Sequence, residues 1–148
     1  MERRTSVALA QGFPRAARLR AARDFEACRA PSFRASARWL NLSARIGEKS
    51  GDGGAAPVRI GVTVGKRKAR KSVQRNMVKR MVREAARVLL PRLERAAAGR
   101  RVDVVVRMKA EFPSAELMPL VAFRRGLRAE ADRLLLQLAE QLGLLAQG

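Results

Sequence analysis

The segment from residue 72 to residue 90 constrains the fold most, because it separates basic and apolar side chains onto two sides of one helix. At about 100° per residue, its polar positions fall within one arc of roughly 140°. These positions are Arg75, Asn76, Lys79, Arg80, Arg83 and Arg87. Opposite them lie Met77, Val78, Met81, Ala85 and Leu89. Such a helix packs its apolar side on another element, which we expect to be a sheet, and presents cations on its other side. We expect it to end near Leu90, since Pro91 follows.

Strand patterns lie on both sides of this helix. Residues 32–46 contain a clear alternation of apolar with other side chains, residues 58–65 are β-branched, and residues 101–108 form the clearest strand pattern. The alternation sets Trp39, Asn41 and Ser43 against Leu40, Leu42 and Ala44. The glycine-rich segment 47–57 predicts a long hairpin connection.

Two further helices complete the predicted order. Residues 15–29 place Leu19, Ala22 and Phe25 on one face of a short helix, and Pro31 ends it. A long helix from Leu120 to about Leu142 follows the 3–4 spacing. Its apolar positions are Phe123, Leu127, Ala131, Leu134, Leu135, Leu138 and Leu142. The order helix, strands, helix, strand, helix predicts a small two-layer α+β sandwich.

The domain organisation follows from these elements. We expect residues 13–142 to form a single domain. Residues 1–12 are expected to be a disordered basic arm, and residues 143–148 a frayed tail.

Charge indicates the partner. The 148 residues include 32 Lys and Arg against 13 Asp and Glu, a net charge of +19. Between Arg59 and Arg87 stand eleven basic residues and one acid, Glu84. Cations this dense repel one another, and phosphates relieve the repulsion. Nucleic acid is therefore the first partner to consider, ahead of an anionic membrane surface or a merely solvated basic helix.

The residues that the chain lacks exclude several kinds of site. Without histidine or tyrosine, the chain cannot build Ser-His-Asp or Cys-His nucleophiles or histidine-ligated metal sites. The lone Cys28 excludes an internal disulfide, fits a reducing cytoplasm, and is expected to be a small buried apolar residue. No apolar run reaches transmembrane length, and no pair of carboxylates suggests a two-metal nuclease. We expect no membrane partner and no small-molecule substrate.

The stretch RIGVTVGKRKARKSVQRNMVKRMVRE, residues 59–84, resembles the protein component of bacterial ribonuclease P. The shared pattern is a strand ending in a basic pair, a short basic loop, and Arg-Asn-x-x-Lys-Arg-x-x-Arg-Glu opening a helix. Here those positions are Lys66, Arg67, Arg75, Asn76, Lys79, Arg80, Arg83 and Glu84. RLRAARDFEACR, SFRASARWLNL, VDVVVRMK and FRRGLRAEADRLLLQL resemble further parts of the family, so that the resemblance covers residues 13–142.

The resemblance implies a fold and a function. The fold is an α+β sandwich of αβββαβα order, like the second domain of ribosomal protein S5, with a four-stranded sheet and a left-handed strand–helix–strand crossover. The implied function is to bind the catalytic RNA of ribonuclease P and the 5′ leader of precursor tRNA during endonucleolytic removal of that leader. The RNA with its Mg²⁺ is the catalyst, and the protein alone binds no cofactor and is inactive. The alternatives are a ribosomal or ribosome-assembly RNA-binding protein without a catalytic role, and a self-sufficient nuclease.

The resemblance also implies site residues. Those for RNA binding are Lys66, Arg67, Arg70, Lys71, Arg75, Asn76, Lys79, Arg80 and Arg83. Those for the leader cleft are Phe25, Phe33, Trp39 and Arg107, with Lys66 and Arg67 able to line the same cleft. Core packing is the alternative for the aromatic residues, and solvated surface is the alternative for the cations.

The chain departs from the family pattern at two places. Met77 stands where the family has arginine, so Arg70 and Lys71 are candidates to supply that RNA contact. The first helix lacks a second aromatic residue near Cys28 and Arg29, and a smaller aromatic cleft is expected.

Overall fold

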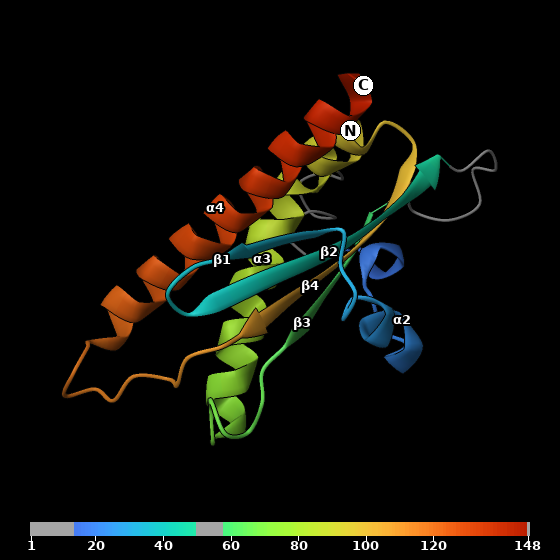
Figure 1. The fold of residues 1–148 in the computed structure, drawn as a ribbon. Coiled ribbons are helices and arrows are strands. Elements are labelled where there is room, and N and C mark those ends of the chain that lie inside the picture. Colours follow the sequence, from blue (N-terminus) through green and yellow to red (C-terminus); the bar gives the residue numbers. More distant parts are fainter. Residues whose placement is uncertain (1–13, 50–57, 148) are drawn as a thin grey trace, which may run out of the picture.

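One four-stranded sheet forms the centre of the molecule. The computed structural model describes residues 14–49 and 58–147; the arm predicted at residues 1–12 lies outside them. The strands are β1 (Phe33–Ser36), β2 (Leu40–Lys49), β3 (Val58–Thr63) and β4 (Arg100–Met108), in the spatial order β1-β2-β4-β3. β1 pairs antiparallel with β2, β2 antiparallel with β4, and β3 parallel with β4 (Figure 1).

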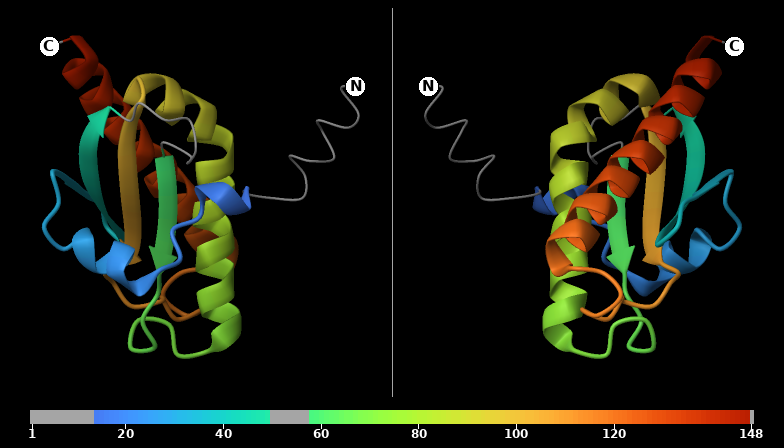
Figure 2. Two further views of the ribbon diagram at one scale, coloured as in Figure 1. Left: turned by 90° about the vertical axis from the view of Figure 1, so that its right-hand side faces the viewer. Right: turned by 90° about the vertical axis from the view of Figure 1, so that its left-hand side faces the viewer.

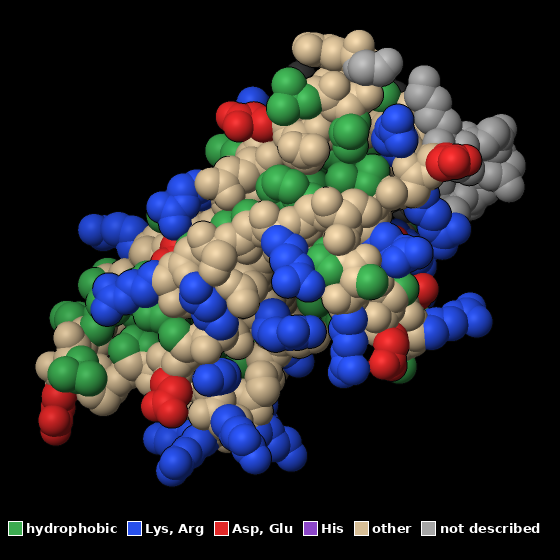
Figure 3. Space-filling view, in the orientation of Figure 1, with side chains coloured by type: hydrophobic (Ala, Val, Ile, Leu, Met, Phe, Trp, Pro, Cys, Tyr) green, Lys and Arg blue, Asp and Glu red, His purple; other side chains and the backbone are tan. Residues whose placement is uncertain are grey.

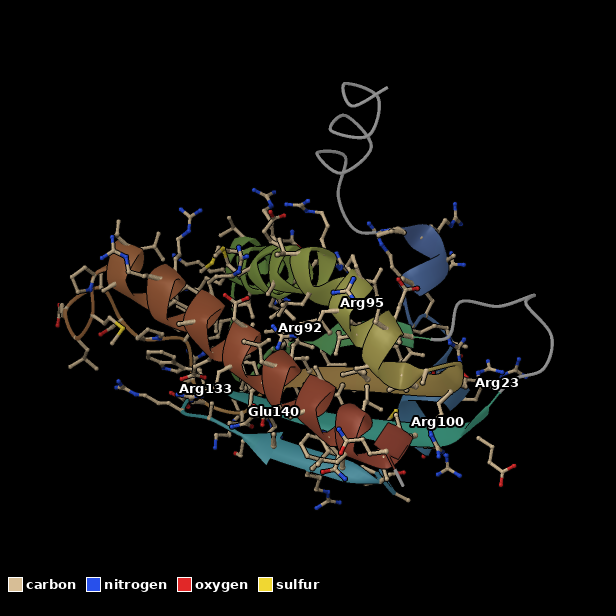
Figure 4. The ribbon with its side chains drawn as sticks, turned by 90° about the horizontal axis from the view of Figure 1, so that it is seen from above. Arg23, Arg92, Arg95, Arg100, Arg133 and Glu140 are labelled. Carbon is tan, nitrogen blue, oxygen red and sulfur yellow. The ribbon has the colours of Figure 1, made fainter. Side chains whose placement is uncertain are left out.

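Helices lie on both faces of this sheet. The long helices α3 (Ser72–Ala97) and α4 (Leu120–Gln147) lie side by side over one face (Figure 4). α3 covers β3 and β4, whereas α4 covers β1 and β2. The short helix α2 (Ala22–Ala27), preceded by the single turn η1 (Arg15–Ala17), lies on the opposite face (Figure 2). The predicted α+β fold and its element order are confirmed: the sheet and the two long helices form the two predicted layers, and the short α2 is added on the other face. None of the described helices is long and apolar enough to cross a membrane.

The connection from β3 to β4 has the uncommon hand. In Figure 1 the chain leaves β3, passes behind the sheet through α3, and returns as β4 on the right of β3 when both strands point upward. This crossover is left-handed, against the strong right-handed preference of such units. It places the N-terminus of α3 and the carboxyl ends of β3 and β4 at the same end of the molecule.

The core lies between the sheet and the two long helices. Every apolar position predicted for α4, from Phe123 to Leu142, is buried. In α3, Val78 and Ala85 are buried as predicted, whereas Met77, Met81 and Leu89 are only partly buried. Val82 and Ala86, which were not predicted, are fully buried because α3 packs against both the sheet and α4.

The predicted ends of the two long helices are wrong. α3 does not end near Leu90 but continues through Pro91 to Ala97, where Ala98 and Gly99 adopt positive φ angles of 51° and 84°. Pro91 is exposed, and burial of Leu93 and Ala97 offsets the hydrogen bond that the proline removes. α4 extends past Leu142 to Gln147, through most of the segment predicted as a frayed tail.

The first predicted helix is divided into two short pieces. Between η1 and α2 the chain is extended, and the Leu19 N–H donates to the Ile60 carbonyl of β3 at 3.0 Å. Leu19 and Phe25 nevertheless meet as predicted, in a small cluster with Cys28 and Val105 on the α2 face of the sheet.

A buried carboxylate fixes the turn between β1 and β2. Glu130 of α4 is 7% exposed and accepts three backbone N–H groups. Its Oε1 receives the Trp39 and Leu40 N–H groups at 2.9 and 3.2 Å, and its Oε2 receives that of Arg38 at 3.1 Å. The carboxylate therefore holds the edge of the sheet to the helical layer.

Candidate nucleic-acid interface

The basic loop, residues 65–71, joins the end of β3 to the start of α3. Lys66, Arg67, Arg70 and Lys71 are all exposed on it. The Arg75 guanidinium folds back from the first turns of α3, and its Nη1 donates to the carbonyl oxygens of Ala69 and Arg70 at 2.9 and 2.8 Å. Arg75 thus holds the loop in shape while adding a positive charge to it.

The basic face of α3 consists of Asn76, Lys79, Arg80 and Arg83. Asn76, Arg80 and Arg83 are exposed and Lys79 is half-buried. Among the described residues, no ion pair involves Lys79, Arg80 or Arg83. Desolvation, followed by the nearby charge of Arg18, lowers the pKa of Arg83. Cations held together in this way favour a polyanion as their counter-charge.

Arg87, also predicted on the cationic arc, has a partner within the protein. Its guanidinium forms two hydrogen bonds with the Glu84 carboxylate, the Nε–Oε2 contact at 3.2 Å and a second from Nη2 to Oε1. This hydrogen bonding lowers the pKa of Glu84 and raises that of Arg87. The unpaired part of the arc therefore stops at Arg83. Arg92 and Arg95 are exposed in the C-terminal half of the helix (Figure 4).

A hollow lies on the opposite side of the sheet from α3 and α4, and we call it the sheet cleft. It consists of two adjoining cavities of about 730 and 630 Å³, both lined by Arg29 and Arg107. The larger one brings together four of the predicted residues, Phe25, Lys66, Arg67 and Arg107. Figure 3 shows Lys and Arg side chains over this face and at its lower end.

α2 is held against the sheet by an ion-pair network and by a close aromatic contact. Arg59 of β3 binds Asp103 of β4 through two hydrogen bonds of 3.0 and 2.9 Å and reaches Asp24 of α2 at 3.4 Å. The hydrogen bonding to Asp103 is the main reason that the pKa of Arg59 is raised. The Phe25 ring lies so close to Gly61 that a Cβ there would stand 2.5 Å from it. These contacts together hold α2, which forms a wall of the cleft, against β3 and β4.

Phe33 and Trp39 do not lie in this cleft, and that part of the prediction is corrected. Phe33 pairs with Ala44 and points to the helical side of the sheet, where it is partly buried in the main core. Trp39 is 7% exposed and packs edge-on against Phe123, with ring centroids 5.2 Å apart. Its ring also lies against Gly126 of α4, where a Cβ would stand 2.9 Å away.

Strand residues that the sequence analysis did not select line the cleft instead. They are Arg34 and Ser36 of β1 and Asn41 and Ser43 of β2, beside Arg29 after α2. Lys109 Nζ donates to Ser36 Oγ at 2.7 Å, and the Ser36 hydroxyl donates to Asn41 Oδ1 at 2.6 Å. The signal for the strand residues was the alternation: Asn41 and Ser43 alternate with the buried Leu40, Leu42 and Ala44, and Arg34 and Ser36 alternate with partly buried apolar residues of β1. The cleft is consequently cationic and polar, with Phe25 as its aromatic residue.

The described residues contain no group of three or more Cys, Asp or Glu side chains able to hold a metal ion. Cys28 is buried, as predicted, and its Sγ–H donates to the Asp103 carbonyl at 3.6 Å. Burial, then the Asp103 charge, raise the pKa of the Cys28 thiol, which disfavours the nucleophilic thiolate.

The family model and the known proteins that match this chain both concern ribonuclease P. Residues 13–140 match the family model described as Ribonuclease P. The ribonuclease P protein component of Burkholderia pseudomallei (strain 1106a) is 32% identical over 138 residues, covering 88% of this chain and 91% of that protein. That of Ralstonia pickettii (strain 12J) is 40% identical over 81 residues, covering 55% of this chain. This shorter match spans 54% of the Ralstonia protein, so about half the length of that relative is covered.

Two solved structures share the fold. The RNase P protein of Staphylococcus aureus superposes with a TM-score of 0.57 at 17% identity, covering 80% of this chain and 92% of that one. The RNase P protein from Thermotoga maritima gives a TM-score of 0.53 at 23% identity, covering 78% of this chain and 96% of that one. At these identities the likeness concerns the fold alone.

Proposed function

The chain belongs to the ribonuclease P protein component family, and from this membership we propose that it serves as the protein subunit of a ribonuclease P ribonucleoprotein. Its partners are the catalytic RNA and precursor tRNA, and the reaction is endonucleolytic removal of the 5′ leader. In such a particle the RNA would be the catalyst, and Mg²⁺ held by the RNA would supply an activated water. The protein contributes by binding and positioning both RNAs.

The observation that carries this proposal is the junction between two surfaces. The basic face of α3 lies on one side of the basic loop, and the sheet cleft lies on the other. Lys66 and Arg67 of the loop line the cleft, whereas Arg70 and Lys71 lead into α3. Because Arg75 clamps the loop, the two surfaces have a fixed relative position. An RNA bound to α3 and a strand bound in the cleft would therefore meet at this loop.

Each surface suits a different kind of RNA contact. On α3, Lys79, Arg80 and Arg83 have the charge and spacing to bind phosphates of a folded RNA, and Asn76 can reach a sugar hydroxyl or a phosphate. In the cleft, Phe25 can stack on an unpaired base while Lys66, Arg67 and Arg107 follow the backbone. Stacking and phosphate contacts tolerate many sequences, as a subunit that handles many precursors requires.

A cleavage assay on precursor tRNA tests the proposal. The purified protein alone should leave the substrate intact. Together with the ribonuclease P RNA from the same genome, at limiting Mg²⁺, it should raise the rate of leader removal. Cleavage without the RNA would instead establish a self-sufficient nuclease. Failure to bind that RNA or stimulate cleavage would favour a ribosomal or ribosome-assembly role.

A further inference from the structure

An apolar pocket, which shares Lys71 with the basic loop, opens at the same end of the molecule as that loop. It has a volume of about 440 Å³ and lies between the first turns of α3, the segment 109–119 and the start of α4. Its apolar walls include Val73, Met77, Phe112, Met118 and Leu120. The hydrophobic surface around its mouth is visible at the lower left of Figure 3.

Several large apolar side chains at or beside this pocket are exposed to solvent. Val73 is 68% exposed, Leu120 is 51% exposed, and neighbouring Leu117 and Val121 are 84% and 66% exposed. Large apolar side chains gathered at one place on a charged protein mark a site that another molecule covers. Met77, the residue that replaces an arginine of the family pattern, faces this pocket and adds to its apolar wall.

The charge around the pocket selects the kind of molecule. Lys71 is the charged residue among those that line the pocket, Arg70 stands next to it in the exposed loop, and the exposed Arg124 follows one turn after Leu120. The exposed Glu111 and Glu116 belong to the segment 109–119 but are not among the lining residues. A second copy of this chain docked symmetrically here would bring these cations against their own counterparts. A polyanion would be attracted by them instead.

The pocket is also continuous with the proposed RNA interface. The Phe112 N–H donates to the Lys68 carbonyl at 2.7 Å, so the wall of the pocket is tied to the basic loop. Met77 directly follows Asn76 of the basic face, and Val73 lies one turn earlier on the same helix. An RNA following the basic face toward the N-terminus of α3 would therefore pass the mouth of the pocket.

We propose that this pocket takes an unstacked nucleobase of the RNA bound to α3. A nucleobase has flat apolar faces, which suit the methionine, valine and phenylalanine walls, and polar edges. The Ser114 hydroxyl and the Gln74 amide lie among the lining groups and can meet those edges. The inference rests on the proposed function, because it assumes that α3 binds the RNA of ribonuclease P.

The test compares two matched double variants. Val73→Ser with Leu120→Ser removes apolar wall without changing charge. Val88→Ser with Leu144→Ser makes the same two changes on the same two helices, at positions that are 51% and 63% exposed and away from the pocket. Affinity for the ribonuclease P RNA is measured across a salt series, after circular dichroism has established that both variants are folded.

The pocket variant should bind about tenfold more weakly, the usual scale for loss of one stacked base. Its salt dependence should be unchanged, because no phosphate contact is lost. The control should stay within about twofold of the wild type. Chemical probing should reveal one base that the wild type and the control protect and that the pocket variant leaves reactive.

Other outcomes overturn the inference in distinguishable ways. Equal RNA affinity of the two double variants would show that no base occupies the pocket. The proposed function would still stand if Arg80→Ala with Arg83→Ala weakened RNA binding. Absence of RNA binding by the wild type would remove both proposals together. A wild-type dimer, detected by sedimentation and lost in the pocket variant, would assign the pocket to self-association. Binding of an acidic peptide with no protected base would assign it to a protein partner.

Discussion

Replacing Glu130 by glutamine should destabilise the protein more than the same replacement at an exposed position of α4. The carboxylate accepts three backbone N–H groups, two of them from the buried residues Trp39 and Leu40. In Glu130→Gln one oxygen becomes an NH₂ group, so that a hydrogen-bond donor faces backbone N–H groups that are themselves donors. The variant also loses the extra strength that a charged acceptor gives to each hydrogen bond.

The size of the effect follows from these contacts. An unsatisfied buried N–H costs about 1–3 kcal/mol, and a hydrogen bond to a charged group contributes about 1.5–3 kcal/mol. Removing a buried charge recovers part of this loss because its desolvation cost disappears. We therefore expect the free energy of unfolding to fall by about 2–4 kcal/mol. For a chain of this size, that corresponds to a fall in Tm of roughly 5–15 °C.

Urea denaturation, followed by circular dichroism and by fluorescence of Trp39, measures this change. The control is Glu140→Gln, the same substitution at an exposed position of α4 (Figure 4). It should shift the free energy of unfolding by less than about 0.5 kcal/mol. If the free energy of unfolding of Glu130→Gln matched that of this control, the three hydrogen bonds would not be what holds the β1–β2 turn in place.

Three further predictions concern Gly61 in the wall of the sheet cleft and the titration of Cys28 and Glu84. Gly61→Val should displace the Phe25 ring and lower the free energy of unfolding by about 1–3 kcal/mol in urea denaturation; an unchanged value would mean that the ring has room to move. Because the raised pKa of Cys28 keeps its thiol neutral in the folded protein, its stabilising contribution is complete below about pH 9 and declines as the pH rises through the higher folded value. The stability difference between wild type and Cys28→Ala should therefore narrow in alkali, and a constant difference would contradict the raised pKa. Because the Arg87 bond lowers the pKa of Glu84, its contribution is present above about pH 4.5 and is lost as the pH falls through the lower folded value. A pH series of wild type against Glu84→Gln should show the two curves converging in acid; parallel curves would count against the pair.

Spacing along the chain predicted the long helices well, because their burial repeats with the helical period. Every predicted apolar position of α4 is in the core. The end of α3 was missed because proline is a local signal, whereas the burial of Leu93 and Ala97 depends on tertiary packing. The spatial order of the strands was not predicted: the hairpin expected over residues 47–57 would pair β2 with β3, whereas β4 lies between them. The left-handed crossover came only from the family resemblance.

The candidate site was predictable in its cations and less so in its aromatic residues. The basic face of α3 follows from angular position alone. Trp39 was assigned to the same side of the sheet as Asn41 because they alternate in the sequence, but Trp39 precedes β2 and lies in the turn. Its orientation depends on Glu130 and Gly126, which are too distant in sequence to be recognised as neighbours.

The central claim is that the N-terminal half of α3, rather than positive charge in general, binds the RNA. Salt dependence of RNA affinity tests it most directly. Arg80→Ala with Arg83→Ala is compared with Arg92→Ala and Arg95→Ala, which removes the same charge from exposed positions in the other half of the helix. The first variant should lose affinity and reduce the slope of log K against log salt by about two, while the second should leave the slope close to that of the wild type. Equal slopes and equal losses for the two variants would contradict the account.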